Sequence, residues 1–334
     1  MTKLVLTKEK YEHLKRLSND QNIIAALAID QRGSLKKMLA EGNPNPKGDE
    51  AIITFKECIS EELTPYSSSI LLDPEYGISA SKKRDENCGL IVAYEKTGYD
   101  ATEIGRLPDL LPNWSAKRIK ELGADAVKVL LYYDIDESDD INDIKHAWVE
   151  RVGSECVAEN IPFFLEIVSY DATNDDVKSA AYAKVKPHKV NDAMKVFSEA
   201  PYNVDVLKVE VPVNMAFVEG FTKDGVEPVY TKEEAKAFFK EQADITHLPF
   251  IFLSAGVSAE LFQDTLVFAK EAGSNFNGVL CGRATWKDSV PVFAKEGETS
   301  CRAWLAEHGK HNIDALNDVL VTSASSWEDK VTVL

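Results

Sequence analysis

The sequence predicts a (β/α)8 barrel with an extra N-terminal helix, and two observations support this prediction. Eight short apolar runs, each bounded by turn residues, have the length and composition of buried strands. Segments with helical periodicity separate most of these runs, and such alternation indicates parallel strands. The chain has 334 residues, enough for one barrel, so we expect a single domain over residues 1–334. The predicted strands are 23–30, 68–73, 89–94, 126–133, 162–168, 206–212, 249–255 and 277–282.

Helices are expected where apolar residues recur at spacings of three and four. Ser115, Thr231 and Ser258 are candidate N-caps for three of these helices, and Gly273 is a C-cap candidate. The predicted helices are 7–18, 47–63, 115–122, 139–159, 191–199 and 258–272, with one more that begins at Thr231. We expect the segment 7–18 to cover the closed end of the barrel.

A doubly wound open sheet would explain the same alternation of strands and helices. That fold binds its cofactor at a G-x-G-x-x-G turn, and this pattern follows none of the predicted strands. The sequence also contains no internal linker, low-complexity tract or repeat beyond the strand–helix period. The barrel is therefore the preferred prediction.

The net charge of −17 argues against nucleic acid or an acidic membrane surface as a partner. No run approaches the roughly 20 apolar residues of a membrane span, and the N-terminus lacks the apolar core of a signal peptide. The five cysteines are odd in number and widely spaced, which is typical of a reducing cytosol. The sequence therefore predicts a cytoplasmic protein.

Four ionisable residues interrupt or end predicted strands that are otherwise aliphatic. Lys208 lies within 206–212, Lys128 within 126–133 and Glu166 within 162–168, while Asp30 ends the first strand. Charged side chains are rarely buried without a reason. Because residues near the carboxyl ends of barrel strands converge at one mouth, we expect these four side chains to form one polar site. The alternative is a set of internal ion pairs with no chemistry.

The four residues suit the cleavage of a carbon–carbon bond through an iminium ion. A desolvated lysine is a nucleophile toward carbonyls, and Lys208 is our candidate for the imine. Lys128 would favour the neutral amine through like-charge repulsion. Glu166 would transfer protons, and Asp30 would orient or stabilise the cationic intermediates.

Two strand ends carry the parts of a barrel phosphate site. Ser254, Ala255 and Gly256 follow the seventh strand, and Gly282 and Arg283 follow the eighth. Small residues, glycine amides and an arginine at these two strand ends bind phosphate in many barrels. Taken alone, the first of these segments is equally consistent with an ordinary strand-to-helix turn.

A second anion site is expected after the first strand. Gln31, Arg32 and Ser34 follow Asp30 directly, and Arg32 supplies the positive charge. The alternative is a surface arginine beside a helix N-cap. For metal binding, the close pair His308 and His311 lacks a third ligand nearby, so neither a metal nor a cofactor is predicted.

Five motifs together give the chain a resemblance to a known family. They are Ala28–Ser34, Gly123–Lys128, Phe164–Glu166, Leu207–Glu210 and Leu253–Gly256, accompanied by Cys281–Ala284. The chain closely resembles the tagatose-1,6-bisphosphate aldolases of lactose-utilising Gram-positive bacteria, which are class I aldolases, over essentially its whole length. The resemblance implies a TIM barrel that forms an imine at Lys208 without a metal. It also implies cleavage of D-tagatose 1,6-bisphosphate to dihydroxyacetone phosphate and glyceraldehyde 3-phosphate, in galactose and lactose breakdown.

Two departures from the wider class I fructose-bisphosphate aldolases follow from the same resemblance. Those enzymes carry a phosphate-binding arginine where this chain has Leu130, so Arg32 becomes our first candidate for the far phosphate. They also end in a tyrosine that assists proton transfer, whereas this chain ends in Leu334. Glu166 would then carry more of the proton transfer, and looser control would permit mixed stereochemistry.

Two other functions remain open from the sequence. One is an aldolase for a different ketose phosphate, such as fructose 1,6-bisphosphate or a sulfo-sugar phosphate, because epimers differ by a single hydroxyl orientation. The other is a barrel that senses sugar phosphates and acts through a protein partner. We expect a homo-oligomer, a dimer or tetramer, although the sequence does not determine which.

Overall fold

Eight parallel strands close into a barrel within the part of the chain that the structure describes. The computed structural model describes residues 3–42, 48–96 and 102–334. Strand order follows the sequence, and the last strand pairs with the first, with Ala25 opposite Val279. This closure confirms the predicted barrel and excludes the open sheet. The barrel strands are β2 Ile24–Ala28, β3 Ser69–Leu72, β4 Gly89–Ala93, β5 Ala126–Tyr133, β6 Phe163–Ser169, β7 Val206–Val209, β8 Phe250–Leu253 and β9 Gly278–Cys281.

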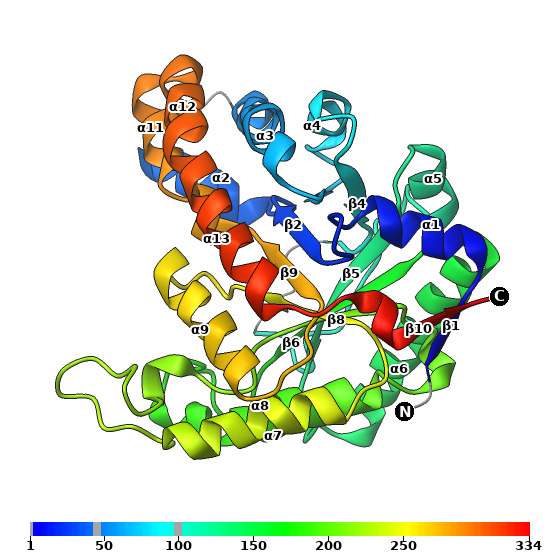
Figure 1. Cartoon of the computed structure of the whole chain (residues 1–334). Coiled ribbons are helices and arrows are strands. Elements are labelled where there is room, and N and C mark those ends of the chain that lie inside the picture. The colour runs from blue at the N-terminus through cyan, green and yellow to red at the C-terminus, as the bar shows by residue number, and fades with distance from the viewer. Residues whose placement is uncertain (1–2, 43–47, 97–101) are drawn as a thin grey trace.

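Helices surround the barrel and connect its strands (Figure 1). The α-helices are α1 Lys8–Arg16, α2 Gly33–Gly42, α3 Asp49–Leu63, α4 Ile78–Lys83, α5 Ala116–Glu121, α6 Asp139–Ala158, α7 Ala180–Val196, α8 Lys232–Asp244, α9 Ala259–Glu271, α10 Arg283–Trp286, α11 Ser289–Glu296, α12 Glu298–Trp304 and α13 Lys310–Ser323. Short 3-10 turns are η1 Thr64–Tyr66, η2 Ala200–Tyr202, η3 Met215–Phe217 and η5 Trp327–Lys330, and η4 Leu305–Gly309 is a π turn.

The predicted N-caps are confirmed. Side-chain oxygens of Ser115, Thr231 and Ser258 each accept a backbone N–H from the first turn of their helix. The helix expected over 47–63 is α3, although Lys47 lies outside the described residues. The helix expected over 191–199 instead begins at Ala180, because Ser179 caps it there and Pro187 is accommodated inside it.

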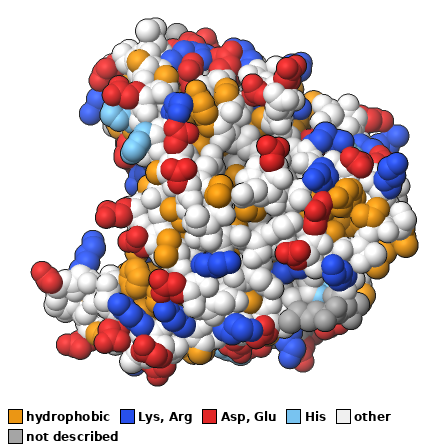
Figure 2. All heavy atoms as spheres, in the orientation of Figure 1, with side chains coloured by type: hydrophobic (Ala, Val, Ile, Leu, Met, Phe, Trp, Pro, Cys, Tyr) orange, Lys and Arg blue, Asp and Glu red, His pale blue; other side chains and the backbone are white. Residues whose placement is uncertain are grey.

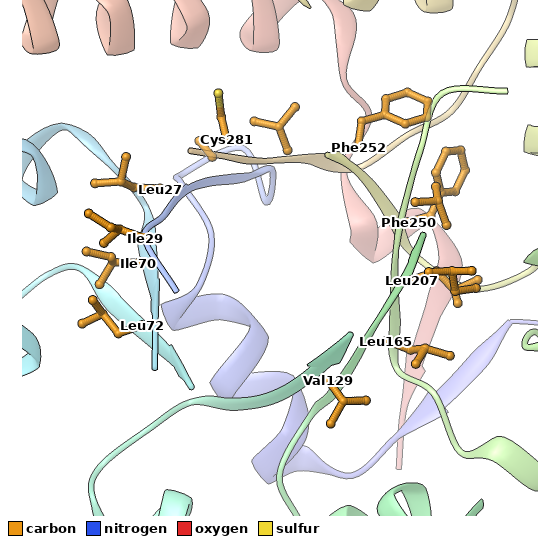
Figure 3. Close-up of a cluster of buried hydrophobic side chains, with 14 of the residues drawn as sticks. Leu27, Ile29, Ile70, Leu72, Val129, Leu165, Leu207, Phe250, Phe252 and Cys281 are labelled. Carbon is orange, nitrogen blue, oxygen red and sulfur yellow. The ribbon is translucent and has the colours of Figure 1, made fainter. Parts of the chain in front are cut away.

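The strands bury both of their faces, one against the helices and one inside the barrel. Side chains such as Leu27, Val129, Leu165, Leu207 and Phe252 point outward from the ring of strands (Figure 3) and belong to the large core beneath the helices. Successive side chains on a strand point to opposite faces. The residues next to these positions therefore face the barrel interior.

The helix α1 covers the amino-terminal end of the barrel, as predicted. Leu14 and Leu17 pack in the same core cluster as Ile24 and other inward-facing residues of the strands. Lys10 of α1 also pairs with Asp205, which immediately precedes β7, at 2.7 Å. Because α1 closes this end of the barrel, the site must lie at the carboxyl ends of the strands.

A small second sheet brings the two ends of the chain together (Figure 1). In it β1, Leu4–Leu6, pairs in parallel with β10, Val331–Val333. Neither strand was predicted, because each is short and pairs with a segment at the far end of the chain.

Acidic and basic side chains are interspersed on the face of the molecule drawn in Figure 2. Among the described residues, no helix combines the length and the apolar composition needed to cross a membrane.

Candidate active site

The strand register brings the predicted charged residues close together in the barrel interior. Lys128, Glu166 and Lys208 occupy inward-facing positions of β5, β6 and β7, which alternate with the outward-facing core residues. Glu166 is the register partner of both Leu130 on one side and Lys208 on the other. Lys128 therefore starts two residues lower on β5, and its long side chain extends up to the level of Glu166.

Glu166 bridges the two lysines. One carboxylate oxygen, Oε1, lies 2.8 Å from Nζ of Lys208, and the other, Oε2, lies 2.8 Å from Nζ of Lys128. Asp30, which follows β2, contacts the same Lys128 nitrogen at 2.8 Å. All four predicted residues thus form one continuous network. A carboxylate, and not open space, separates the two lysines, so Glu166 is the group placed to exchange a proton with Lys208.

The network controls its own protonation. Burial would raise the pKa of Asp30 and of Glu166, but the ammonium groups of Lys128 and Lys208 outweigh burial and lower the pKa of both carboxyls. Burial would lower the pKa of Lys128, yet Asp30, Glu166 and Glu95 together raise it well above its ordinary value. Asp30 and Glu166 are therefore carboxylates at neutral pH, and Lys128 is a permanent cation.

Glu95 also belongs to this network, although it was not among the predicted site residues. Its Oε1 lies 2.7 Å from Nζ of Lys128, and the residue is only 4% exposed. Glu95 stands two residues after Ala93, at the end of β4, just as Asp30 stands two residues after Ala28 at the end of β2. The same period-two rule would have identified it, because Ala93 is an inward-facing residue.

The two predicted phosphate segments meet at the ends of β8 and β9. Ala255 and Gly256 both have positive φ, 49° and 73°, which turns the chain sharply after Ser254. A Cβ at Gly256 would lie 3.0 Å from the guanidinium carbon of Arg283. A Cβ at Gly282 would lie 2.7 Å from the carbonyl oxygen of Ala28. The arginine therefore packs directly on the glycine turn, as a combined anion site requires.

Gln31, Arg32 and Ser34, which follow β2, do not form the open anion site that the sequence predicts. The Arg32 guanidinium is buried and is held by Glu75 at 2.5 Å and by the carbonyl oxygen of Glu95 at 2.7 Å. Gln31 is partly buried, and its Oε1 has no partner among the described residues. Ser34 is exposed in the first turn of α2.

Another arginine, Arg106, approaches the mouth from the loop between β4 and α5. Its guanidinium lies 4.4 Å from the ring centre of Tyr170 and 5.6 Å from that of Tyr132. Tyr132 faces inward on β5, four residues after Lys128 and thus nearer the mouth. Asp175, 91% exposed, contacts Arg106 at 3.6 Å. Arg106 was not predicted, because nothing in its local sequence indicates that its side chain reaches Tyr132 and Tyr170.

A closed barrel with two inward-facing lysines bridged by a carboxylate has the groups that an imine-forming lyase needs. The comparisons with known proteins agree with this class. The family model described as DeoC/LacD family aldolase matches residues 24–288, and the chain belongs to this family.

Several named relatives resemble the chain along almost its full length. Tagatose 1,6-diphosphate aldolase 2 of Enterococcus faecalis is 62% identical over 330 residues, which cover 99% of each chain. Tagatose 1,6-diphosphate aldolase of Staphylococcus haemolyticus is 61% identical over 324 residues, or 97% of this chain and 99% of the relative. The tagatose 1,6-diphosphate aldolase of Streptococcus pneumoniae is 59% identical over 328 residues, which cover 98% of this chain and 100% of the relative.

Solved structures share the fold at low sequence identity. Fructose-bisphosphate aldolase of Plasmodium falciparum matches with a TM-score of 0.66 and 16% identity, covering 95% of this chain and 97% of that chain. A Schiff-base-forming fructose-1,6-bisphosphate aldolase matches with a TM-score of 0.52 and 16% identity, covering 88% and 97%. These likenesses support the barrel fold.

Proposed function

We propose that this protein cleaves D-tagatose 1,6-bisphosphate to dihydroxyacetone phosphate and D-glyceraldehyde 3-phosphate through an imine on Lys208. The observation that carries the proposal is the contact of Glu166 with both lysines, at 2.8 Å each. It provides a nucleophile and a proton carrier at one place. The substrate is the one that the names of the full-length relatives give.

Imine formation begins when Glu166 Oε1 accepts a proton from Nζ of Lys208. The freed amine attacks the ketone carbon and forms a carbinolamine. Glu166 then returns a proton to the departing hydroxyl, water leaves, and a protonated imine links Lys208 to the substrate. Because Glu166 contacts Nζ directly, the same carboxylate serves both proton transfers.

Cleavage follows from the positive charge on the imine. The hydroxyl next to the scissile bond loses its proton to Glu166, the carbon–carbon bond breaks, and its electron pair moves into the iminium to give an enamine. The aldehyde product leaves. A proton then returns to the enamine carbon, and water hydrolyses the resulting imine to release the ketone product and Lys208.

Lys128 and Asp30 assist without forming bonds to the substrate. The Lys128 cation keeps Glu166 ionised and so able to accept a proton. Asp30, through its contact with Lys128, fixes the ammonium group of that lysine. This preorganised charge needs little rearrangement as the iminium forms.

Ser254, Ala255, Gly256, Gly282 and Arg283 are our proposed site for the phosphate nearest the ketone. The turn after β8 presents backbone N–H groups, and Arg283, packed on Gly256, supplies the positive charge. For the far phosphate we propose Gln31, Arg32 and Ser34, with Arg106 as the competing candidate. Arg32 would have to leave Glu75 to reach a ligand, whereas Arg106 already lies over the mouth.

The two arginines are distinguished by a pair of substrates. Removing the group that binds the far phosphate should weaken the binding of a ketose bisphosphate. It should have less effect on the binding of a ketose phosphorylated only at the ketone end. We therefore compare KM for both substrates in Arg32→Ala and Arg106→Ala. The variant that raises KM for the bisphosphate selectively identifies the residue, and an equal effect on both substrates excludes it.

Trapping the imine tests the proposed function. Borohydride reduction in the presence of dihydroxyacetone phosphate should link the ligand covalently to Lys208 alone, as read by peptide mapping. Labelling of Lys128 instead would reverse the roles of the two lysines. Cleavage rates for the epimeric ketose bisphosphates and a sulfo-sugar phosphate identify the preferred substrate, and turnover after prolonged EDTA treatment checks that no metal is needed.

The proposal also covers the cellular location and the oligomeric state of the enzyme. We expect a cytoplasmic homo-oligomer, a dimer or tetramer, without a nucleic-acid partner. Light scattering on the purified protein gives its mass in solution and decides between these assemblies.

A further inference from the structure

One oxygen of Glu95, in the middle of the catalytic network, has no hydrogen-bond partner within the described part of the chain. Oε1 accepts from Nζ of Lys128 at 2.7 Å, but Oε2 is buried and has no partner among the described residues. The side chain is 6% exposed, and the Glu95 backbone oxygen is fixed by Arg32 at 2.7 Å. An ionised carboxylate would here leave a charged oxygen both desolvated and unpaired, which is costly.

The charges of the network lead to the same conclusion. Lys128 and Lys208 are balanced by Asp30 and Glu166, with which they form 2.8 Å contacts. An ionised Glu95 would add a third negative charge to two positive ones in a buried site. The charged groups around this site, from β2, α3, β3, β5, β6 and β7 and the segments that follow, are Asp30, Arg32, Lys56, Asp73, Glu75, Lys128, Glu166 and Lys208.

The other cations nearby each have a carboxylate of their own. Arg32 is paired with Glu75, and Lys56 with Asp73, so each pair is neutral as a whole. Burial and the negative charge of Asp30 raise the pKa of Glu95 and outweigh the attraction of Lys128 and Arg32. The pKa of Asp30 and of Glu166 is instead lowered in the same network. Glu95 is therefore the carboxyl of this network whose pKa is shifted in the opposite direction from the pKa of Asp30 and Glu166.

We propose that Glu95 is a positioning residue that holds the Lys128 ammonium as a neutral carboxylic acid. Oε1 is then the carbonyl oxygen that accepts from Lys128, and the proton resides on Oε2. A neutral acid fixes Lys128 in place without adding negative charge. Lys128 consequently keeps its full effect on Glu166, the proton carrier of the proposed reaction, on which this inference rests.

The neutral form predicts that glutamine replaces this residue well. Glu95→Gln presents the same carbonyl acceptor to Lys128 and carries no charge, so it should keep most of the wild-type kcat. Glu95→Ala removes the acceptor, and the resulting displacement of Lys128 should lower kcat by about 10²-fold. If Glu95 had only a structural role, the kcat values of the two folded variants would not differ in this way. Circular dichroism checks that both variants are folded.

The pH profile gives a second readout. The neutral acid is present below the raised pKa of Glu95 and is lost as the pH rises through it. Wild-type kcat should therefore fall on the alkaline side where Glu95 ionises, and Glu95→Gln should lack this fall. The same fall in both proteins would show that another group is responsible.

Infrared spectroscopy tests the protonation directly and does not depend on activity. The difference spectrum between the wild-type protein and Glu95→Gln should contain the carbonyl band of a buried protonated carboxylic acid. The difference is needed because burial also raises the pKa of Asp205. Asp125→Asn is the matched control, because Asp125 is an ionised carboxylate at the amino-terminal end of the barrel and its replacement leaves the charge of the network unchanged. A difference spectrum that lacks this band, or a kcat for Glu95→Gln as low as for Glu95→Ala, would overturn the inference. Failure of borohydride trapping in the wild type would instead overturn the proposed function.

Discussion

Buried charges lie at both ends of the barrel, but the two ends combine them differently. At the amino-terminal end, Asp205 accepts from Lys10 at 2.7 Å and from the backbone. Asp125 there contacts His13 at 3.0 Å and Arg16 at 2.7 Å, and also accepts a backbone N–H. Each carboxylate has its own cation from α1, and both of them also bind a strand. These pairs fasten a helix to the barrel.

At the carboxyl end the charged groups are shared. Glu166 serves both Lys128 and Lys208, and Lys128 is contacted by three carboxyl groups, those of Asp30, Glu95 and Glu166. The carboxyl groups outnumber the ammonium groups, and one carboxyl oxygen has no partner among the described residues. The comparison teaches that the two arrangements suit different roles. Carboxylates that each have their own cation, as at the amino-terminal end, stabilise the fold. A network that shares its charges and leaves one oxygen unpaired, as at the carboxyl end, is suited to proton transfer.

Replacing Lys208 is the strongest test of this difference. Lys208→Met keeps the length of the side chain but removes the amine, so cleavage should be almost entirely lost while the fold remains. The measurement is the steady-state cleavage rate, with circular dichroism as the control for folding. Substantial remaining cleavage would move the imine to another lysine.

Replacing Glu166 tests proton transfer within the shared network. Glu166→Gln keeps the size and polarity of the side chain but does not carry a proton, so kcat should fall by about 10²–10⁴-fold. Borohydride trapping should still detect some imine. An unchanged kcat would assign the proton transfer to Asp30 or another carboxyl.

Replacing Arg283 tests ground-state binding next to the network. In a chain with a net charge of −17, a bisphosphate depends on local cations, and Arg283 packs on the turn at Gly256. Arg283→Ala would leave the phosphate underpaired at a cost of about 2–5 kcal/mol. KM should rise strongly, and inorganic phosphate should inhibit the wild type competitively but the variant much less. A KM equal to that of the wild type would place the phosphate elsewhere.

Replacing Asp125 tests the other end of the barrel and should have the smallest effect on turnover. Asp125→Asn removes the charge that His13 and Arg16 contact, so the free energy of unfolding at neutral pH should fall by about 1–3 kcal/mol. Because Asp125 belongs to the closed end, kcat at moderate temperature should be unchanged. A large loss of kcat in a folded variant would contradict the separation of the two ends.

The pH dependence of the same variant follows from the lowered pKa of Asp125, which burial opposes and the contacts with His13, Leu90 and Arg16 produce. A lowered carboxyl pKa stabilises the fold above the unfolded value of about 3.9. That contribution is lost as the pH falls through the folded pKa. Urea unfolding should therefore show a constant difference between wild type and Asp125→Asn at neutral pH, and a shrinking difference in acid.

The sequence by itself determined the barrel and the centre of its site. Eight apolar runs identified the strands, because a strand buried on both faces must be aliphatic. Lys128, Glu166 and Lys208 were conspicuous for the same reason, and the alternation of side chains along a strand made them face one interior. The alternation of side chains along β4 also directs Glu95 inward. Glu95 lies just beyond its predicted strand, however, and a charged residue at that position is ordinary.

The tertiary structure alone decided how these groups are paired. Glu166 lies between the lysines because of the register of β6 against β7, and register is a contact between segments distant in the chain. Arg32 is occupied by Glu75, and Arg106 lies over Tyr170, because of the paths of loops that carry no periodic pattern. Periodicity determines which side of an element a residue faces. The partner it meets there depends on the packing of distant segments, which local sequence does not encode.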